Sequence, residues 1–186
     1  MNVGVKADIA DNAKLYTARV IGGNDRGFVG ASLSRFNVTA GTADVSANAV
    51  SALGGLSFPV GTSSARICPI VQGTYTMGPN YTVSTIKVES SQMSGVAGLS
   101  IGGSVRVSDG FHVLPYGGAS ANYQRISVSA NNVSSNETDT NGTVFGGVSL
   151  LFNGRFAIQP AINVPVGTKN NDPVYSIGAT IGLGKR

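Results

Sequence analysis

The chain has 186 residues and a net charge of +4, so it is long enough for one domain with a substantial interior, expected to span residues 1–186. Only 12% of the residues are charged, against roughly 25% in a typical soluble domain. The basic residues stand singly, which argues against nucleic acid as a partner, and the lone Cys68 excludes an internal disulfide or a multi-cysteine metal site.

Apolar and polar residues alternate from the amino terminus onward, which predicts β-strands. Met1 leads directly into this alternation and not into a signal peptide, which for an exported protein predicts a mature form. The first two predicted strands flank an Asp-Asn turn, and the third has an ambiguous parity. In chain order, the first five predicted strands are residues 3–9, 15–21, 28–39, 47–60 and 66–77.

The alternation is clearest between Gln92 and Val107, where Leu99 and Ile101 share the apolar parity and Ser100 has the polar one. This predicted strand is about fifteen residues long, whereas a soluble strand averages about five or six and a membrane-crossing strand needs about nine to eleven. No apolar run approaches the roughly 18 residues of a membrane helix, so a membrane protein here must be a β-barrel. The remaining predicted strands are residues 111–126, 144–152, 156–164 and 175–183.

We therefore predict an all-β, antiparallel, up-and-down transmembrane β-barrel of ten strands. A closed barrel needs its first and last strands to pair, so residues 3–9 should pair with 175–183. The alternative is eight strands preceded by a loose amino-terminal tail.

Short turns near Asn24, Ser63, Asp109 and Gly154 alternate with longer loops, and aromatic residues such as Phe111 and Tyr123 lie near strand ends. In this architecture the chain resembles the small outer-membrane β-barrel family, the group of OmpA-like, OmpX-like and opacity-type barrels. The resemblance implies a porin-like protein of the Gram-negative outer membrane, with outer-membrane lipid as a partner and short turns in the periplasm.

The polar residues at alternate positions of the strands are expected to face the lumen. Buried charges need partners, so we expect a lumen filled, or nearly filled, by ion pairs and amide hydrogen bonds, with a narrow polar pore as the alternative. The candidates are Lys6, Asp8, Arg19, Arg66, Gln72, Gln92, Arg106, His112, Gln124, Gln159 and Asn163.

Two polar stretches, residues 78–91 and 127–141, are expected to be mobile surface loops and a possible site for an extracellular ligand. No cofactor is expected. Envelope barrels that act as acyl hydrolases or transferases use a His with a Ser, but a His-x-Ser pattern is missing at His112, the only histidine.

The sequence therefore indicates a non-enzymatic barrel that is structural, binds surfaces or passes small solutes. The alternative is a soluble ligand-binding barrel of the lipocalin or dirigent type, whose apolar parity would line an internal calyx.

Overall fold

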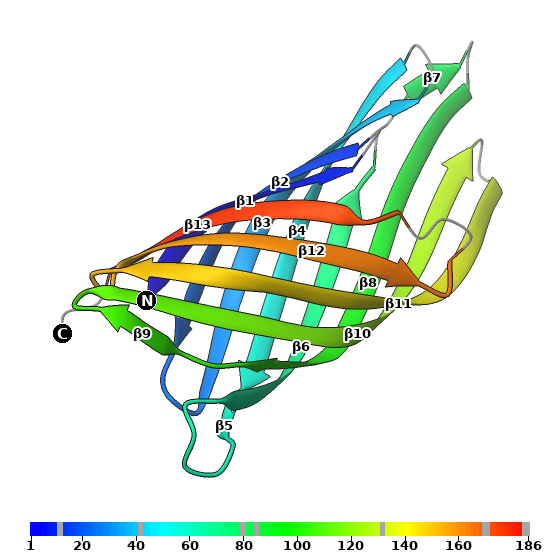
Figure 1. Cartoon of the computed structure of the whole chain (residues 1–186). Helices are drawn as coiled ribbons and strands as arrows, with labels where there is room; N and C mark the ends of the chain where they lie inside the picture. Colours follow the sequence, from blue (N-terminus) through cyan, green and yellow to red (C-terminus); the bar gives the residue numbers. More distant parts are fainter. Residues whose placement is uncertain are drawn as a thin grey trace.

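A computed structural model describes residues 1–10, 13–40, 43–78, 81–83, 86–130, 133–168 and 172–183. These residues form one antiparallel sheet of thirteen strands, which closes on itself because β6 pairs with β8 (Figure 1). Among them, no helix is long and apolar enough to cross a membrane.

Ten strands of nine or more residues make the wall of the barrel in the described part of the chain. They are β1 (Asn2–Ala10), β2 (Ala13–Gly23), β3 (Gly27–Ala40), β4 (Ala43–Leu56), β6 (Arg66–Met77), β8 (Ile86–Gly102), β10 (Phe111–Ala130), β11 (Val133–Phe152), β12 (Phe156–Val166) and β13 (Val174–Gly182). Three short strands extend the wall near its rims, and they are β5 (Phe58–Pro59), β7 (Tyr81–Val83) and β9 (Val105–Ser108).

Each wall strand pairs with the next one along the chain, and β1 pairs with β13 to complete the ring. The closing ladder places Val3 opposite Ile181 and Ile9 opposite Tyr175. The predicted ten-strand barrel is confirmed, and the alternative of eight strands with a loose tail is wrong. Closure leaves no row of unpaired backbone groups facing hydrocarbon, where each would cost several kcal/mol.

One rim of the barrel carries the tight turns together with Met1 and Leu183, the first and last residues that the structure describes (Figure 1). The two residues meet there, since the amide of Leu183 donates to the carbonyl of Met1 at 2.8 Å. The turn between β11 and β12 has φ of 50° at Asn153 and 65° at Gly154. Two consecutive positive φ values are typical of the type I′ turn that matches strand twist, and Asn-Gly is its preferred sequence.

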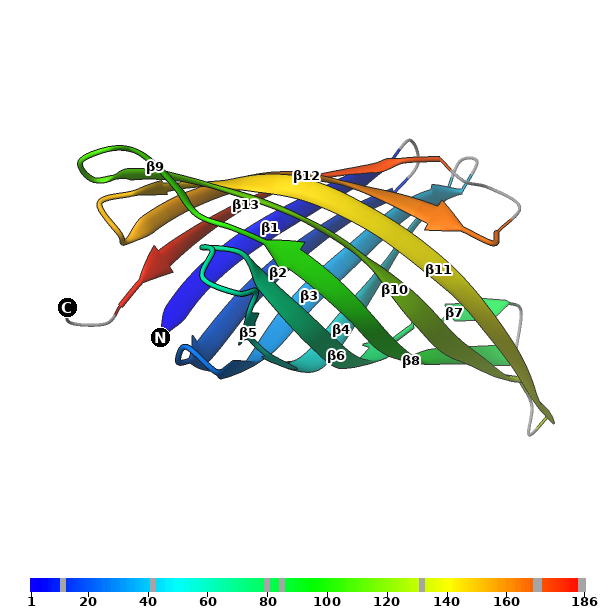
Figure 2. The same ribbon diagram turned by 60° about the horizontal axis from the view of Figure 1, so that its bottom comes forward.

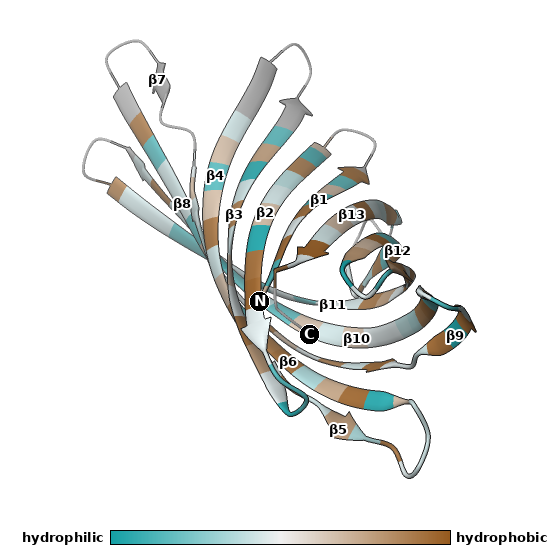
Figure 3. Ribbon diagram, turned by 90° about the vertical axis from the view of Figure 1, so that its left-hand side faces the viewer, coloured by the Kyte–Doolittle hydropathy of each residue, from teal (hydrophilic) through white to brown (hydrophobic). Residues whose placement is uncertain are grey.

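Apolar and polar residues alternate along the strands (Figure 3), and the large apolar side chains are the exposed ones, which places them on the outside of the barrel. Leu99 is 53% and Ile101 is 51% exposed on this face. The lipocalin-like alternative is therefore wrong, because its apolar residues would line the inside.

Aromatic residues mark the two ends of the outward apolar surface. Four outward tyrosines lie toward the rim opposite the termini, and they are Tyr16, Tyr75, Tyr123 and Tyr175. At the rim with the tight turns, Phe152 stacks on Phe111 with ring centroids 5.1 Å apart, and Phe156 lies 6.1 Å beyond. Such belts occur where a membrane protein meets the two interfaces of the bilayer.

The two stretches expected as loops are mostly strand. Within residues 127–141, β10 continues to Ala130 and β11 begins at Val133, with Ser127 opposite Asn136. Within residues 78–91, β7 pairs with the start of β8, and the amide of Gly78 donates to the carbonyl of Ser90. The sequence did not predict strand here because every residue of β11 from 133 to 140 is exposed to solvent. Neither face of the strand has to be apolar in water, so apolar and polar residues need not alternate.

The depth of an outward residue in the bilayer should determine how much an arginine at that position destabilises the barrel. Ile101 lies opposite Gly117, halfway along β10 between Phe111 and Tyr123. Ile101→Arg should lower the free energy of unfolding by about 2–4 kcal/mol, since arginine is most costly at the bilayer midplane. Urea titration in lipid vesicles measures this.

Met93→Arg is the matched control, because Met93 lies opposite Tyr75 at the level of the outward tyrosines. It should cost about 1 kcal/mol or less. Equal destabilisation by the two substitutions would contradict the assigned membrane depth.

The closing ladder makes a second prediction. Deleting residues 1–24 removes β1 and β2, so that β3 and β13 each lose one of their two neighbouring strands. The truncated chain should lose the heat-resistant folded band in detergent electrophoresis, because ten-strand closure is gone. A truncated chain with an undiminished folded band would show that the first two strands are dispensable.

Candidate functional site

Three large aromatic side chains point into the barrel, and each lies directly across the ladder from a glycine. Phe145 is opposite Gly118, Tyr116 is opposite Gly147, and Phe28 is opposite Gly55. A Cβ on Gly118 would approach the Phe145 ring to 2.7 Å, a Cβ on Gly55 would approach the Phe28 ring to 2.6 Å, and a Cβ on Gly147 would approach the Tyr116 hydroxyl to 2.7 Å. The rings therefore lie against the wall, over backbone that has no side chain, and leave interior space open.

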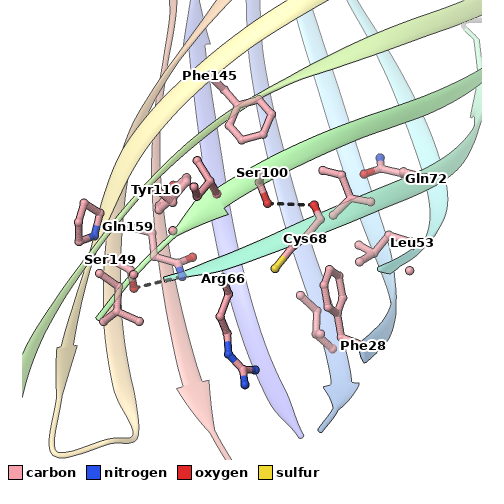
Figure 4. A pocket seen from close by; sticks show the side chains of 18 of the residues that line it. Phe28, Leu53, Arg66, Cys68, Gln72, Ser100, Tyr116, Phe145, Ser149 and Gln159 are labelled. Carbon is pink, nitrogen blue, oxygen red and sulfur yellow. Dashed lines mark hydrogen bonds between the residues drawn. The ribbon is translucent and has the colours of Figure 1, made fainter. Parts of the chain in front are cut away.

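Two cavities occupy the interior of the barrel in the described structure. The first, which we call the lower chamber, measures about 610 Å³ and lies toward the tight-turn rim (Figure 4). Its polar lining includes Arg19, Arg66, Gln72, Tyr116 and Gln159, and no described carboxylate lines it. Serines, glycines and apolar side chains, with Cys68 beside them, make up the rest of its wall.

Arg19 anchors a hydrogen-bonded cluster in the wall of the lower chamber. Its Nη2 donates to Oε1 of Gln159 at 2.6 Å, and Gln159 Nε2 contacts Ser149 Oγ at 3.4 Å. The backbone ladder between β11 and β12 is interrupted at this point, next to Pro160, which has no amide to donate. Arg19 Nε is itself buried and has no hydrogen-bond partner among the described residues.

The second cavity, which we call the upper chamber, measures about 500 Å³ and has its charges paired. Lys6 Nζ lies 2.6 Å from Asp8 Oδ1, the same oxygen that accepts a 2.6 Å hydrogen bond from Ser176 Oγ. Asn163 Nδ2 in turn donates to Ser176 Oγ at 2.8 Å. The chain of bonds fixes the ion pair on the wall, as expected for buried charges.

Phe145 and Val96 line both chambers. They therefore lie at the boundary between the two, and the aromatic ring is the larger obstacle. The expectation of a filled lumen is wrong, because glycines beside the aromatic rings replace side chains that would otherwise occupy the interior.

The other predicted lumen residues lie at different levels of the barrel. Gln92 donates to Gln124 at 3.1 Å, and Gln124 reaches Asp139 at 3.2 Å, toward the rim opposite the termini. Arg66 lies at the tight-turn rim, where it donates to the carbonyl of Asp25 and to Ser57 Oγ. Gln72 donates to Thr74 in the wall of the lower chamber.

Arg106 and His112 lie apart from both chambers, on the hairpin of β9 and β10. Arg106 is exposed and pairs with Asp109. His112 Nδ1 lies 3.4 Å from Ser104 Oγ, a contact that the sequence pattern did not indicate. The contact is long, and within the described residues no carboxylate orients the imidazole as in a nucleophile–base pair. A metal centre has no support either, since no three His, Cys, Asp or Glu side chains gather in the described part of the chain.

Nothing in the sequence indicated Phe145 as the boundary between the chambers. Its parity, opposite to that of Val144 and Val148, placed it inside the barrel. Only the cross-strand register shows that it faces a glycine and so leaves the lumen open around it.

No known protein-family profile matches the sequence, and no curated protein matches it. The structure is similar to the β domain of the Bordetella autotransporter BrkA, with 13% identity, a TM-score of 0.62 and coverage of 98% of this chain and 97% of that one. It is also similar to LpxR from Salmonella typhimurium, with 8% identity, a TM-score of 0.51 and coverage of 98% and 100%. The attachment invasion locus protein Ail of Yersinia pestis matches with 11% identity, a TM-score of 0.47 and coverage of 97% and 96%. The chain therefore has the fold of bacterial outer-membrane β-barrels.

Proposed function

We propose that this protein is a non-enzymatic, narrow pore that passes small solutes across the outer membrane and prefers anions. The observation that carries the proposal is the pair of chambers along the lumen, which share only the Phe145 and Val96 side chains as a common boundary. A filled barrel would have no space for a solute at either level.

The charge of the two chambers supports the preference for anions. The described residues that line them include three cations, Lys6, Arg19 and Arg66, and one carboxylate, Asp8, for a net charge of +2. Asp8 neutralises Lys6 in the upper chamber. The lower chamber therefore carries the excess positive charge, and charged linings of one sign select the opposite ion in membrane pores.

Phe145 should limit the conductance. Phe145→Ala removes the ring at the boundary and should raise the single-channel conductance in planar bilayers severalfold. Val144→Ala is the control, because Val144 is on the same strand but faces outward and is 50% exposed. If neither the parent protein nor Phe145→Ala conducts, the chain is not a pore.

Arg19 should set the ion preference. Arg19→Gln removes a charge from the lower chamber and should lower the chloride-to-potassium permeability ratio by about fivefold. Even in bulk water, two unit charges 4 Å apart interact by about 1 kcal/mol, and this energy corresponds to about a fivefold change in the occupancy of the chamber by an anion. The reversal potential across a KCl gradient measures the ratio.

Arg125→Gln is the matched control for Arg19→Gln. Arg125 lies opposite the outward Met93, lines neither chamber and should leave the ratio unchanged. An unchanged ratio in Arg19→Gln would refute the role given to the lower chamber.

A second candidate function is the binding of an extracellular surface ligand by residues 78–91 and 127–141. The observation that favours it is the hairpin of β10 and β11, which extends beyond the end of β12 because β12 pairs with β11 only from Gly142 onward (Figure 2). Replacing residues 127–136 with a two-residue Asn-Gly turn, which joins the opposite residues Ile126 and Glu137, should abolish adhesion of expressing cells and leave the conductance intact. Undiminished adhesion would exclude this hairpin as the binding site.

A further inference from the structure

A third cavity lies on the outside of the barrel, on the face that the fold turns toward lipid. It is a groove of about 750 Å³ across six neighbouring strands, β13, β1, β2, β3, β4 and β6. This volume is within the range of about 300–1,000 Å³ that small-molecule sites occupy. We call it the outer groove.

Small side chains make the floor of the outer groove. Ala7 lies between Ile177 and Tyr16 in the ladder, and Ala18 lies between Val5 and Leu33. Ala179, opposite Val5, completes the set. The larger neighbours are exposed and apolar, with Ile177 at 55% and Leu33 at 65%. The floor is therefore a long apolar depression between raised side chains, a shape that fits an acyl chain.

A cation lies at one end of the outer groove. Arg35 is exposed and lies in register with Tyr16 on one side and Asn48 on the other. Tyr16 belongs to the outward tyrosines that mark the interface, so the guanidinium lies near the level of lipid headgroups. Lys6 also contributes to the lining, but its ammonium group pairs with Asp8 in the lumen.

No protein group in the described part of the chain balances the charge of Arg35. The structure gives its guanidinium no hydrogen bond or ion pair there, and no described carboxylate lines the groove. At the level of the outward tyrosines an exposed cation is tolerated, and it can pair there with an anion of the lipid headgroups. A phosphate is a strong partner, because guanidinium can bind it through two parallel hydrogen bonds.

We propose that the outer groove binds one phosphate-bearing membrane lipid, with its phosphate on Arg35 and Asn48 and an acyl chain over Ala7, Ala18 and Ala179. Charge complementarity selects the headgroup, and the apolar floor selects a lipid over a free anion. The site is independent of the lumen, so its existence does not depend on conduction.

The test is native mass spectrometry of the folded, full-length protein in detergent. The probes are dioleoyl phosphatidylglycerol, dioleoylglycerol, which has the same chains without phosphate, and inorganic phosphate. The protein should retain one phosphatidylglycerol, and neither dioleoylglycerol nor inorganic phosphate should replace it. Retention of dioleoylglycerol to the same extent, displacement by inorganic phosphate, or no retained phosphatidylglycerol would each overturn the proposal.

Two pairs of variants separate the headgroup from the chain. Arg35→Gln should lower lipid occupancy about tenfold, as the loss of a charged hydrogen bond implies, whereas Arg125→Gln should not change it. Arg125 is a suitable control because it is also exposed at the level of the outward tyrosines but lines no part of the groove.

Ala18→Leu fills the floor and should lower occupancy with Arg35 intact, whereas Ala121→Leu, an outward alanine of β10, should not. The heat-resistant band in detergent electrophoresis verifies that each variant is folded. Equal occupancy in Arg35→Gln and Arg125→Gln, or in Ala18→Leu and Ala121→Leu, would show that the groove does not hold the lipid.

Discussion

The constraint on which this structure depends is the pairing of backbone amides and carbonyls inside a bilayer. Hydrocarbon supplies no hydrogen-bond partners, so a sheet that crosses it must have no open edge. The ladder between β1 and β13 meets this requirement by joining the first strand to the last. The up-and-down order follows, because each strand pairs with its neighbour in sequence and only the closing ladder is distant in the chain.

Closure with ten strands also determines how much interior space the side chains have to fill. A ring of this size is wider than the eight-strand barrels whose side chains just fill the lumen. Here the inward aromatic rings lie flat against the wall, because the residues opposite them are glycines such as Gly118 and Gly147. Space is thereby left on both sides of Phe145, and the charges that line it determine what can enter. The proposed pore depends on this packing more than on any single polar residue.

The same parity rule has different consequences at different heights of the barrel. Between the aromatic belts, one face of each strand meets lipid, and at the tyrosine belt an outward charge such as Arg35 lies beside the lipid headgroups. Above them, both faces of the β10–β11 hairpin meet water, and its pairing relies on the ladder and on polar contacts such as Ser127 to Asn136. A strand in that region therefore does not need the alternation of apolar and polar residues that identifies a strand inside the membrane.

The alternation in the sequence by itself determined the fold class, the strand order and the face of most residues, because period-2 hydrophobicity records which side meets lipid. It predicted the closing pair of strands and the inward position of Lys6, Asp8, Arg19 and Gln159. It did not predict the extent of β10 and β11, since the signal disappears where both faces are wet. The tertiary structure alone decided which side chains meet, such as Arg19 with Gln159 and Ser104 with His112. It also decided that glycines lie opposite the inward rings and that alanines of three separate strands form one groove, because register across a closed sheet joins residues far apart in the chain.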